Sequence, residues 1–267
     1  MPILEDERTR RNSTLQVDRR SRILVLLDER GSVSVQQLCA LFGTSANTIR
    51  RDLRALTIDN PVQRVHGGAV LRRGRSYEPP FAMRSGKNLA QKLAIGRAAA
   101  RLVKDGDSLA LDVGTTVMDV AKSIVGIQNL TVVTASLHVA NILADAPGIR
   151  LIISGGIVRG GEWSMIGHIA ERTLRDFRVD KAFIGVGALD LNAGLSEYNL
   201  EDALVKRVII EQAAQVIVTA DSSKLGHTSL VSVAPLSVVD VLVTDSQASP
   251  SFLDALREKG VEVILDS

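Results

Sequence analysis

Seven short apolar runs recur between residues 108 and 265 of this chain, and helical stretches separate most of them. The runs are SLALD, LTVVT, IRLIIS, KAFIGVG, QVIVT, DVLVT and VEVIL. Most are almost continuously apolar rather than alternating, which is typical of strands buried on both faces. Such strands form a parallel sheet that helices cover on both sides. Residues 89–267 are therefore predicted to fold as a doubly wound, mainly parallel α/β domain.

The basic charge is concentrated at the other end of the chain. Residues 1–75 carry fourteen arginines, no lysine and eight acidic residues, a net charge of +6, whereas residues 76–267 carry −4. A basic module joined to an acidic one indicates a polyanion as the partner of the first module. The alternative is a merely solvated basic surface.

Other classes of protein are excluded by composition. An apolar share of 45% excludes a chain that is disordered throughout. No apolar run approaches the ~20 residues that span a bilayer, and the N-terminus has no apolar signal core, so we expect a cytoplasmic protein without a membrane partner. The one cysteine and the four widely spaced histidines have no familiar metal-site spacing, so we expect neither a structural metal nor a cofactor.

Residues 18–56 contain three segments with helical periodicity, behind a polar tail over residues 1–14. Ser34 and Gln37 have the spacing of a capping box at the start of the second segment, and Gly43 ends it after barely two turns. Ser45 caps the third segment, whose inward face is Ile49, Leu53 and Leu56. Two short helices joined by a turn that contains glycine form a helix-turn-helix, here about residues 34–56.

The outward face of the third segment is suited to a DNA duplex. At 100° per residue, Asn47, Arg51 and Arg54 lie opposite Ile49, and Thr48 and Arg50 flank them. Arginine can pair with guanine and asparagine with adenine, while Thr48 can meet a phosphate or a thymine methyl. The alternative is the ordinary solvated face of a small helical bundle.

A hairpin is predicted after the helices. VQRVHGGAVL (62–71) places β-branched residues around a Gly-Gly turn, so Arg64 and His66 would face the DNA backbone or minor groove. His66 could equally be only a turn residue. Residues 15–71 are thus predicted to be a winged DNA-binding domain, and residues 72–88, with paired prolines, a linker.

Polar and glycine residues follow five of the predicted strands, where ligands bind in doubly wound folds. Gly114, Thr115 and Thr116 begin a helix, whose N-terminus favours an anion, and Lys224 can neutralise that anion. Taken singly, each could be a cap or turn residue. Nucleotides are disfavoured because the chain has neither a phosphate loop nor a complete G-x-G-x-x-G motif. The other residues predicted at this site are Asp112, Gly155, Gly156, Gly187, Asp190, Glu201 and Asp221.

Both parts of the chain resemble one protein family. LCALFGTSANTIRRDLRAL and RVHGGA resemble the DNA-binding domain of DeoR-type bacterial transcriptional regulators. KLAIGRAA, DVGTT, SGG, GVGALD, NLEDALVKR and DSSKLG resemble their sensor domain, which is similar to ribose-5-phosphate isomerases. The resemblance implies a repressor of a carbohydrate-metabolism operon that binds double-stranded operator DNA and a phosphorylated sugar. It also implies that Thr115, Thr116 and Lys224 bind the phosphate, supported by Asp112, Glu201 and Lys92.

The same resemblance raises the question of catalysis. Counted back from DSSK, the position of the isomerase's catalytic glutamate falls on Lys206, and a protonated lysine cannot accept a proton. Asp190, Glu197 and Glu201 remain as alternative bases. Two hypotheses follow: a ligand-gated regulator that is not an enzyme, or a sugar-phosphate isomerase with an N-terminal association module. Because one recognition helix rarely gives enough affinity, the first implies a homo-oligomer, a dimer or a tetramer.

Overall fold

The computed structural model describes residues 18–28, 30–59, 62–71 and 74–266, so the tail predicted over 1–14 lies outside the described residues. The chain divides into two compact units, Met1–Met83 and Arg84–Ser267. In the described part, no helix combines the length and apolar character that crossing a membrane requires.

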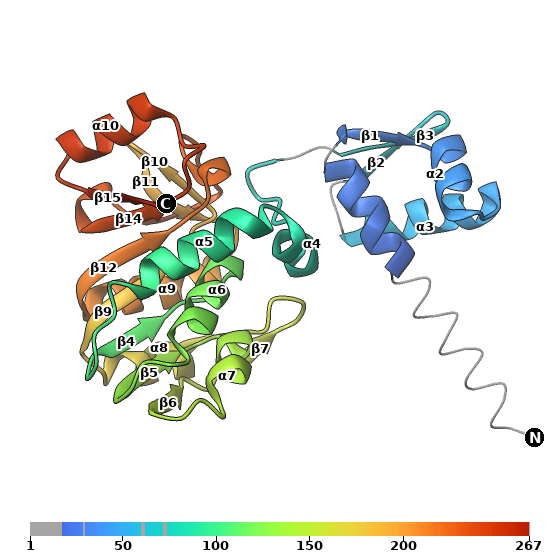
Figure 1. Ribbon diagram of the computed structural model, residues 1–267. Coiled ribbons are helices and arrows are strands. Elements are labelled where there is room, and N and C mark those ends of the chain that lie inside the picture. The colour runs from blue at the N-terminus through green and yellow to red at the C-terminus, as the bar shows by residue number, and fades with distance from the viewer. Residues whose placement is uncertain (1–17, 29, 60–61, 72–73, 267) are drawn as a thin grey trace, which may run out of the picture. The chain divides into compact units, whose positions relative to one another are not determined.

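The first unit contains a helix over residues 18–28 and a three-stranded antiparallel sheet of order β1-β3-β2 (Figure 1). Its further elements are β1 (Ser32–Ser34), α2 (Val35–Phe42), α3 (Ala46–Asp59), β2 (Val62–Val65) and β3 (Gly68–Leu71). The predicted helices and hairpin are confirmed. Strand β1 was not predicted, because three residues are too few to show an alternating pattern.

Local capping and a small core fix these helices. The Ser34 hydroxyl accepts a bond of 3.1 Å from the Gln37 amide, and the Gln37 side chain accepts one of 3.0 Å from the Ser34 amide. Gly43 ends α2 in the left-handed conformation at φ 59°, which an L side chain disfavours. The side chain of Asp52 on α3 is buried and pairs with Arg19 and Arg20 at 2.6 and 3.1 Å. This pairing joins α3 to the first helix.

All seven predicted runs are strands of one parallel sheet in the second unit, with the order β15-β14-β12-β9-β4-β5-β6. Their bounds are β4 (Ser108–Leu111), β5 (Leu130–Thr134), β6 (Ile149–Ile153), β9 (Val179–Ile184), β12 (Ala213–Thr219), β14 (Val241–Thr244) and β15 (Glu262–Leu265). The predicted fold class is confirmed.

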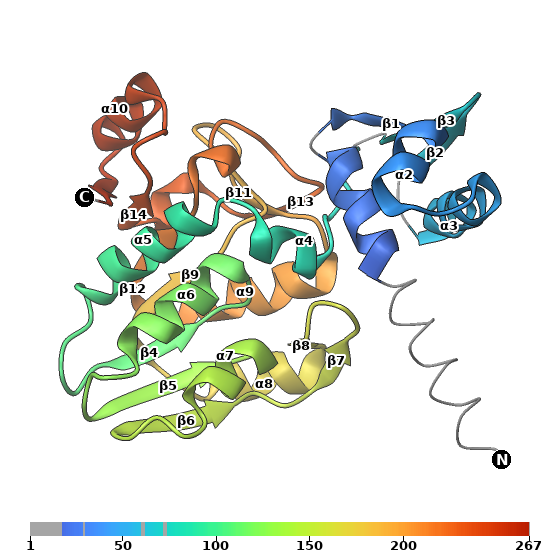
Figure 2. The same ribbon diagram turned by 45° about the vertical axis from the view of Figure 1, so that its right-hand side comes forward.

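Helices cover both faces of this sheet (Figures 1 and 2). Leu109 and Leu111 of β4 enter a core shared with α5 (Leu89–Ala100), α6 (Thr115–Ile124) and α7 (Leu137–Leu143). Ala110, between them, enters the opposite core, which contains side chains of α8 (His168–Arg175), α9 (Leu200–Gln212) and α10 (Pro250–Glu258). The alternation follows from the two-residue period of a strand.

Several short elements were not predicted from the sequence. They are α4 (Phe81–Gly86), within the predicted linker, the hairpin β7 (Ile157–Arg159) and β8 (Ser164–Ile166), and the antiparallel sheet β10 (Ala188–Asp190), β11 (Gly194–Glu197) and β13 (Val231–Ala234). A turn of 3₁₀ helix, η1 (Ser222–Lys224), follows β12. Each is too short for periodicity to show in the sequence.

The strand order contains a switch point between β4 and β9. The chain runs from β4 outward through β5 and β6, then returns to β9 on the other side of β4 and continues to β12. At such a point a crevice opens at the carboxyl ends of the two central strands. Gly185 follows β9 there, and a Cβ at this residue would lie 2.8 Å from the Val113 carbonyl oxygen. Glycine therefore permits the close approach of the two strand ends.

Candidate functional site

In the first unit, the outward face of α3 is exposed. Asn47, Arg50, Arg51 and Arg54 are exposed, and Thr48 is half-buried. Arg50 donates to the Asn47 side chain at 3.3 Å, a weak surface bond that a nucleic acid can replace. The Ser45 hydroxyl accepts from the Thr48 amide at 3.3 Å. It therefore caps the helix as predicted.

The hairpin β2–β3 lies beside the same face. Arg64 and His66 are exposed. A groove of about 350 Å³ separates the hairpin from α3, and it is lined by Arg50, Arg64 and His66, with Val35, Leu53, Val65, Gly67 and Gly68. Two arginines from different elements thus border one concave surface, an arrangement that favours contact with a phosphate backbone.

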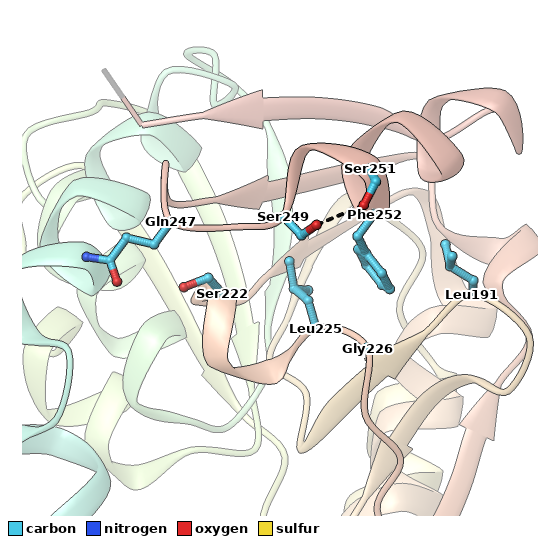
Figure 3. Close-up of a pocket in the computed structure, with 8 residues that line it drawn as sticks. All are labelled: Leu191, Ser222, Leu225, Gly226, Gln247, Ser249, Ser251 and Phe252. Carbon is cyan, nitrogen blue, oxygen red and sulfur yellow. Dashed lines mark hydrogen bonds between the residues drawn. The ribbon is translucent and has the colours of Figure 1, made fainter.

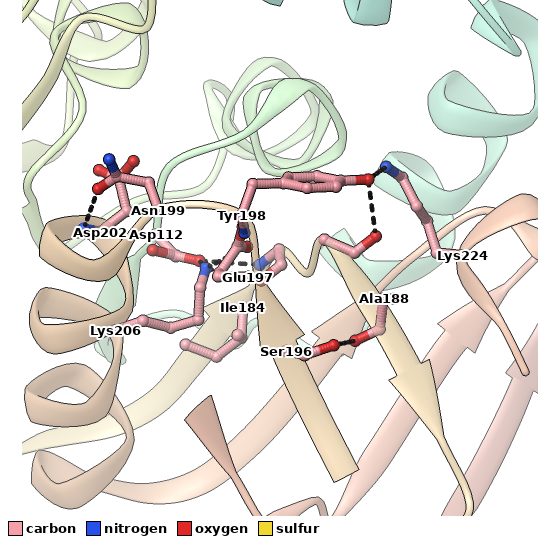
Figure 4. Close-up of polar contacts among 12 residues, drawn as sticks. Asp112, Ile184, Ala188, Ser196, Glu197, Tyr198, Asn199, Asp202, Lys206 and Lys224 are labelled. Carbon is pink, nitrogen blue, oxygen red and sulfur yellow. Dashed lines mark hydrogen bonds and ion pairs between the residues drawn. The ribbon is translucent and has the colours of Figure 1, made fainter. Parts of the chain in front are cut away.

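At the switch point of the second unit, a buried ammonium group joins three elements (Figure 4). The Lys206 Nζ of α9 donates to Asp112 Oδ2 after β4 and, at 2.7 Å, to the Gly185 carbonyl after β9. It also lies 3.4 Å from the Glu197 Oε1 of β11. The side chains of Lys206 and Asp112 are each 1% exposed. Two of the three donors of this ammonium make these hydrogen bonds, and the Glu197 carboxylate adds a second nearby negative charge.

One carboxylate oxygen of this charged centre has no hydrogen-bond partner within the described residues. Burial alone lowers the pKa of Lys206, but the Asp112 and Glu197 carboxylates outweigh burial and raise that pKa above its usual value. Asp112 Oδ2 also accepts from the Gly185 amide at 3.0 Å. Asp112 Oδ1 is buried and has no hydrogen-bond partner within the described protein. Because a buried acceptor without a partner is costly, this oxygen is suited to a ligand hydroxyl.

Tyr198 connects the buried centre to Lys224. Its hydroxyl donates to the Gly187 carbonyl at 3.2 Å and accepts from Lys224 Nζ at 3.4 Å. The same ammonium lies 5.4 Å from the centre of the Tyr198 ring. Lys224 is half-buried, so its side chain is partly shielded from solvent.

Lys92 of α5 is a second cation near Lys224. Its side chain is buried, and its Nζ donates to the Arg84 carbonyl. Burial lowers the pKa of Lys92 to about 8; the Asp221 carboxylate opposes this effect and the Lys224 ammonium adds to it. Lys92, Asp221 and Lys224 therefore lie close enough to influence one another.

The structure brings most of the predicted residues to one place. Thr115 and Thr116 begin α6 directly after Asp112 and are largely buried, with Gly114 preceding them at φ 127°. The N-terminal amides of α6 therefore lie at the carboxyl end of β4. A series of contacts through Lys206, Glu197 and Tyr198 joins Asp112 to Gly187, Lys224, Asp221 and Lys92, and Gly114, Thr115 and Thr116 follow Asp112 in the chain.

Four predicted residues lie elsewhere or have another use. Gly155 and Gly156 follow the edge strand β6 with φ of 69° and 111°, and they lead into the β7–β8 hairpin. Asp190 accepts from the amides of two following residues at 2.9 Å, which closes the β10–β11 turn and lowers the pKa of its carboxyl. Glu201 is exposed on the first turn of α9.

The sequence did not indicate Glu197 and Tyr198 as binding residues, nor Asn88 as a partner of Asp221. Glu197 lies beside Lys206, and Tyr198 lies beside Lys224. Asn88 donates to Asp221 Oδ1 at 3.0 Å. Glu197 lies in a polar run before a helix, and the sequence indicated it only as an alternative catalytic base. Neither Tyr198 nor Asn88 has a local pattern, because their partners are distant in the chain.

A separate pocket lies beside η1 (Figure 3). Its volume is about 480 Å³, and it is lined by Leu191, Ser222, Leu225, Gly226, Gln247, Ser249, Ser251 and Phe252. No charged side chain belongs to this lining within the described residues. An anionic ligand is therefore better matched by the two lysines at the switch point.

Known proteins resemble the chain over both units. The model of the DeoR-like helix-turn-helix domain matches residues 19–74, and that of the DeoR C terminal sensor domain matches residues 87–246. The HTH-type transcriptional repressor GlcR of Bacillus subtilis is 36% identical over 255 residues, 94% of this chain and 96% of that protein. The glycerol-3-phosphate regulon repressor of Escherichia coli K12 is 32% identical over 250 residues, 94% and 99% of the two chains. A solved ribose 5-phosphate isomerase from Methanocaldococcus jannaschii, 19% identical, covers 52% of this chain and 55% of its own with a TM-score of 0.40.

Proposed function

The chain belongs to the DeoR family of transcriptional regulators, and on that premise we propose that it represses a carbohydrate-metabolism operon under the control of a phosphorylated sugar or related anion. The observation that supports the proposal is the pair Lys92 and Lys224, whose ammonium groups are near enough to affect each other. The N-terminus of α6 follows Asp112 at the switch point and adds its amides to this region. Two cations and the amides of a helix N-terminus form a site for a doubly charged phosphate.

The DNA-binding role is assigned to the first unit. Asn47, Arg51 and Arg54 would contact base edges, with Thr48 and Arg50 at the flank of α3. In the hairpin, Arg64 and His66 would contact the backbone or minor groove. A homo-oligomer, dimer or tetramer, would place two such faces on paired half-sites in the cytoplasm. Sedimentation of the DNA complex as a single protomer would contradict this assembly.

Each group of the anion site has a distinct task. Lys224 and Lys92 would neutralise the phosphate, while Thr115 and Thr116 would donate from their amides and hydroxyls. Asp112 Oδ1 would accept from a sugar hydroxyl, which would satisfy a buried oxygen that otherwise has no partner. Asp221 would hold Lys92 in place through its charge.

The buried centre favours recognition over catalysis. Isomerisation needs a carboxylate that accepts a proton from the sugar, and the Lys206 ammonium occupies the middle of this centre with Asp112 and Glu197 paired to it. The alternative is a sugar-phosphate isomerase. Turnover of ribose 5-phosphate that Glu197→Gln or Glu201→Ala abolishes would establish that alternative and overturn our proposal.

Thermal unfolding with a panel of phosphates tests the anion site. The panel would include inorganic phosphate, ribose 5-phosphate, glucose 6-phosphate and, because one relative regulates a glycerol-3-phosphate regulon, glycerol 3-phosphate. A probe at about 100 times its Kd should raise the melting temperature by about 5–10 °C. Lys224→Ala should remove the response, whereas Lys259→Ala, which changes an exposed lysine after α10, should keep it. A response that survives Lys224→Ala would place the anion elsewhere.

Anion affinity should also fall as the pH rises through about 8. The pKa of Lys92 is about 8, so its charge and part of its attraction for phosphate are lost above that value. A phosphate monoester such as glycerol 3-phosphate stays mainly dianionic between pH 7 and 9, because its second pKa is about 6. Calorimetry at constant ionic strength should show the Kd of glycerol 3-phosphate rising about tenfold over this range. Lys92→Met should flatten the curve, and an unchanged slope would rule out Lys92 as the titrating group.

A further inference from the structure

The segment of residues 84–88 begins the second unit and follows the DNA-binding unit directly in the chain. Its contacts include three that reach other parts of the unit. The Arg84 side chain pairs with Glu162, the Arg84 carbonyl accepts from Lys92 Nζ, and the Asn88 amide group donates to Asp221 Oδ1 at 3.0 Å. Two of these three contacts are made by residues of the proposed anion site, Lys92 and Asp221.

Asn88 gives this segment a conformation that depends on its side chain. It is the N-cap of α5 and has φ 53° and ψ 39°, the left-handed region that residues other than glycine adopt at a cost. Asparagine tolerates that region better than most residues. Its bond to the buried Asp221 carboxylate stabilises the bend between α4 and α5.

Lys92 belongs to the proposed anion site and also contacts residues 84–88. Its buried ammonium has three donors, and the Arg84 carbonyl takes one of them. A phosphate held between Lys92 and Lys224 would accept hydrogen bonds from the other two donors. A phosphate there would also offset the repulsion between the two ammonium groups.

We propose that Lys92 bridges the bound anion and the Arg84 carbonyl, so that effector binding tightens residues 84–88 and thereby fixes the start of the connection to the DNA-binding unit. This inference rests on the proposed function, since it takes the anion site as its starting point. A bridging cation makes stronger, charge-assisted bonds on both sides. The tightened and untightened states would differ in operator affinity, and by reciprocity DNA would change anion affinity by the same factor.

Hydrogen–deuterium exchange of the full-length protein tests this bridge. Peptides that cover residues 84–88 would be followed with saturating inorganic phosphate and with sodium chloride at equal ionic strength. Their exchange should slow about 3- to 10-fold with phosphate, and Lys92→Met should abolish the slowing. Exchange that is unchanged or faster in the wild type overturns the proposal.

Asn88→Gly provides a second test with a matched control. Glycine accepts the left-handed backbone without strain, so this variant removes only the bond to Asp221. We expect it to bind phosphate within about twofold of the wild type but to lose most of the slowing. Asn129 has the same backbone conformation, at φ 59°, and a similar bond of 3.1 Å to Asp105. Asn129→Gly should therefore behave as the wild type, and equal slowing in both variants overturns the role of Asn88.

The two proposals fail in different ways. If no phosphate in the panel binds in a manner that requires Lys224, the anion site is wrong and the inference falls with it. If binding requires Lys224 but residues 84–88 exchange at the same rate with and without phosphate, the sensor function stands and only the bridge through Lys92 is refuted.

Discussion

Replacement of Arg51 by alanine should weaken operator binding about 5- to 150-fold at fixed salt. Arg51 is exposed on α3 and, by helical geometry, lies on the side opposite the buried Ile49. Loss of one bidentate contact with a guanine costs about 1–3 kcal/mol, and each 1.4 kcal/mol is a factor of ten in affinity. Fluorescence anisotropy with a duplex that the protein has selected from random sequences would measure the change.

Arg172→Ala is the matched control for this measurement. Arg172 is an exposed arginine on a helix of the other unit, so its removal makes the same change in net charge. Both variants should unfold at the wild-type temperature. Equal affinity of the two variants for the duplex would contradict the assignment of α3. The slope of affinity against salt should stay constant in Arg51→Ala if Arg51 contacts a base, and should decrease if it contacts a phosphate.

The DNA-binding unit was largely predictable because its determinants are local. Ser34, Gln37 and Gly43 lie within ten residues of one another, and the capping bonds and the helix end that they form require nothing distant. The buried Asp52 was not predicted, since its partners Arg19 and Arg20 are more than thirty residues away. Local patterns therefore gave the helices and the exposed face, but not the ion pairs that join the helices.

The larger unit shows the same division. Continuous apolar runs predicted the seven strands, because burial on both faces of a sheet is recorded in composition. Their order is not recorded there, so the switch point between β4 and β9 became visible only in the structure. The convergence of Asp112 and Lys206, which are 94 residues apart, follows from that order. Asp190 illustrates the reverse: a carboxylate at a strand end whose neighbours in the chain already use it.

The sequence around Lys206 also contains a structural signal, apart from the isomerase resemblance. It lies among Val205, Val208 and Ile209, all buried, and a lysine on the apolar face of a helix must find a buried anion. The structure shows that anion to be Asp112, with Glu197 beside it. Lys206 therefore has a structural use that does not depend on the isomerase resemblance.

Lys206→Met should consequently lower the free energy of unfolding of the second unit by about 3–5 kcal/mol. The variant leaves the Asp112 carboxylate buried beside Glu197 without a cation, and breaking a buried ion pair at one partner has an effect of this size. The pKa of Lys206 is raised above its usual 10.5 in the folded protein, so its contribution is fully present below that pH and is lost only at more alkaline pH. Urea unfolding at pH 7 would measure the full effect.

The double variant Asp112→Asn, Lys206→Met separates loss of the pair from loss of packing. It removes both charges, so it should be more stable than Lys206→Met alone, even though it contains one more substitution. If its destabilisation equals the sum of the two single effects, the two groups are not coupled and the buried centre does not depend on their charges. A stable double variant would also show how much an oxygen at the position of Asp112 Oδ1 contributes to ligand binding when the Lys206 charge is gone. Asparagine keeps an oxygen at this position.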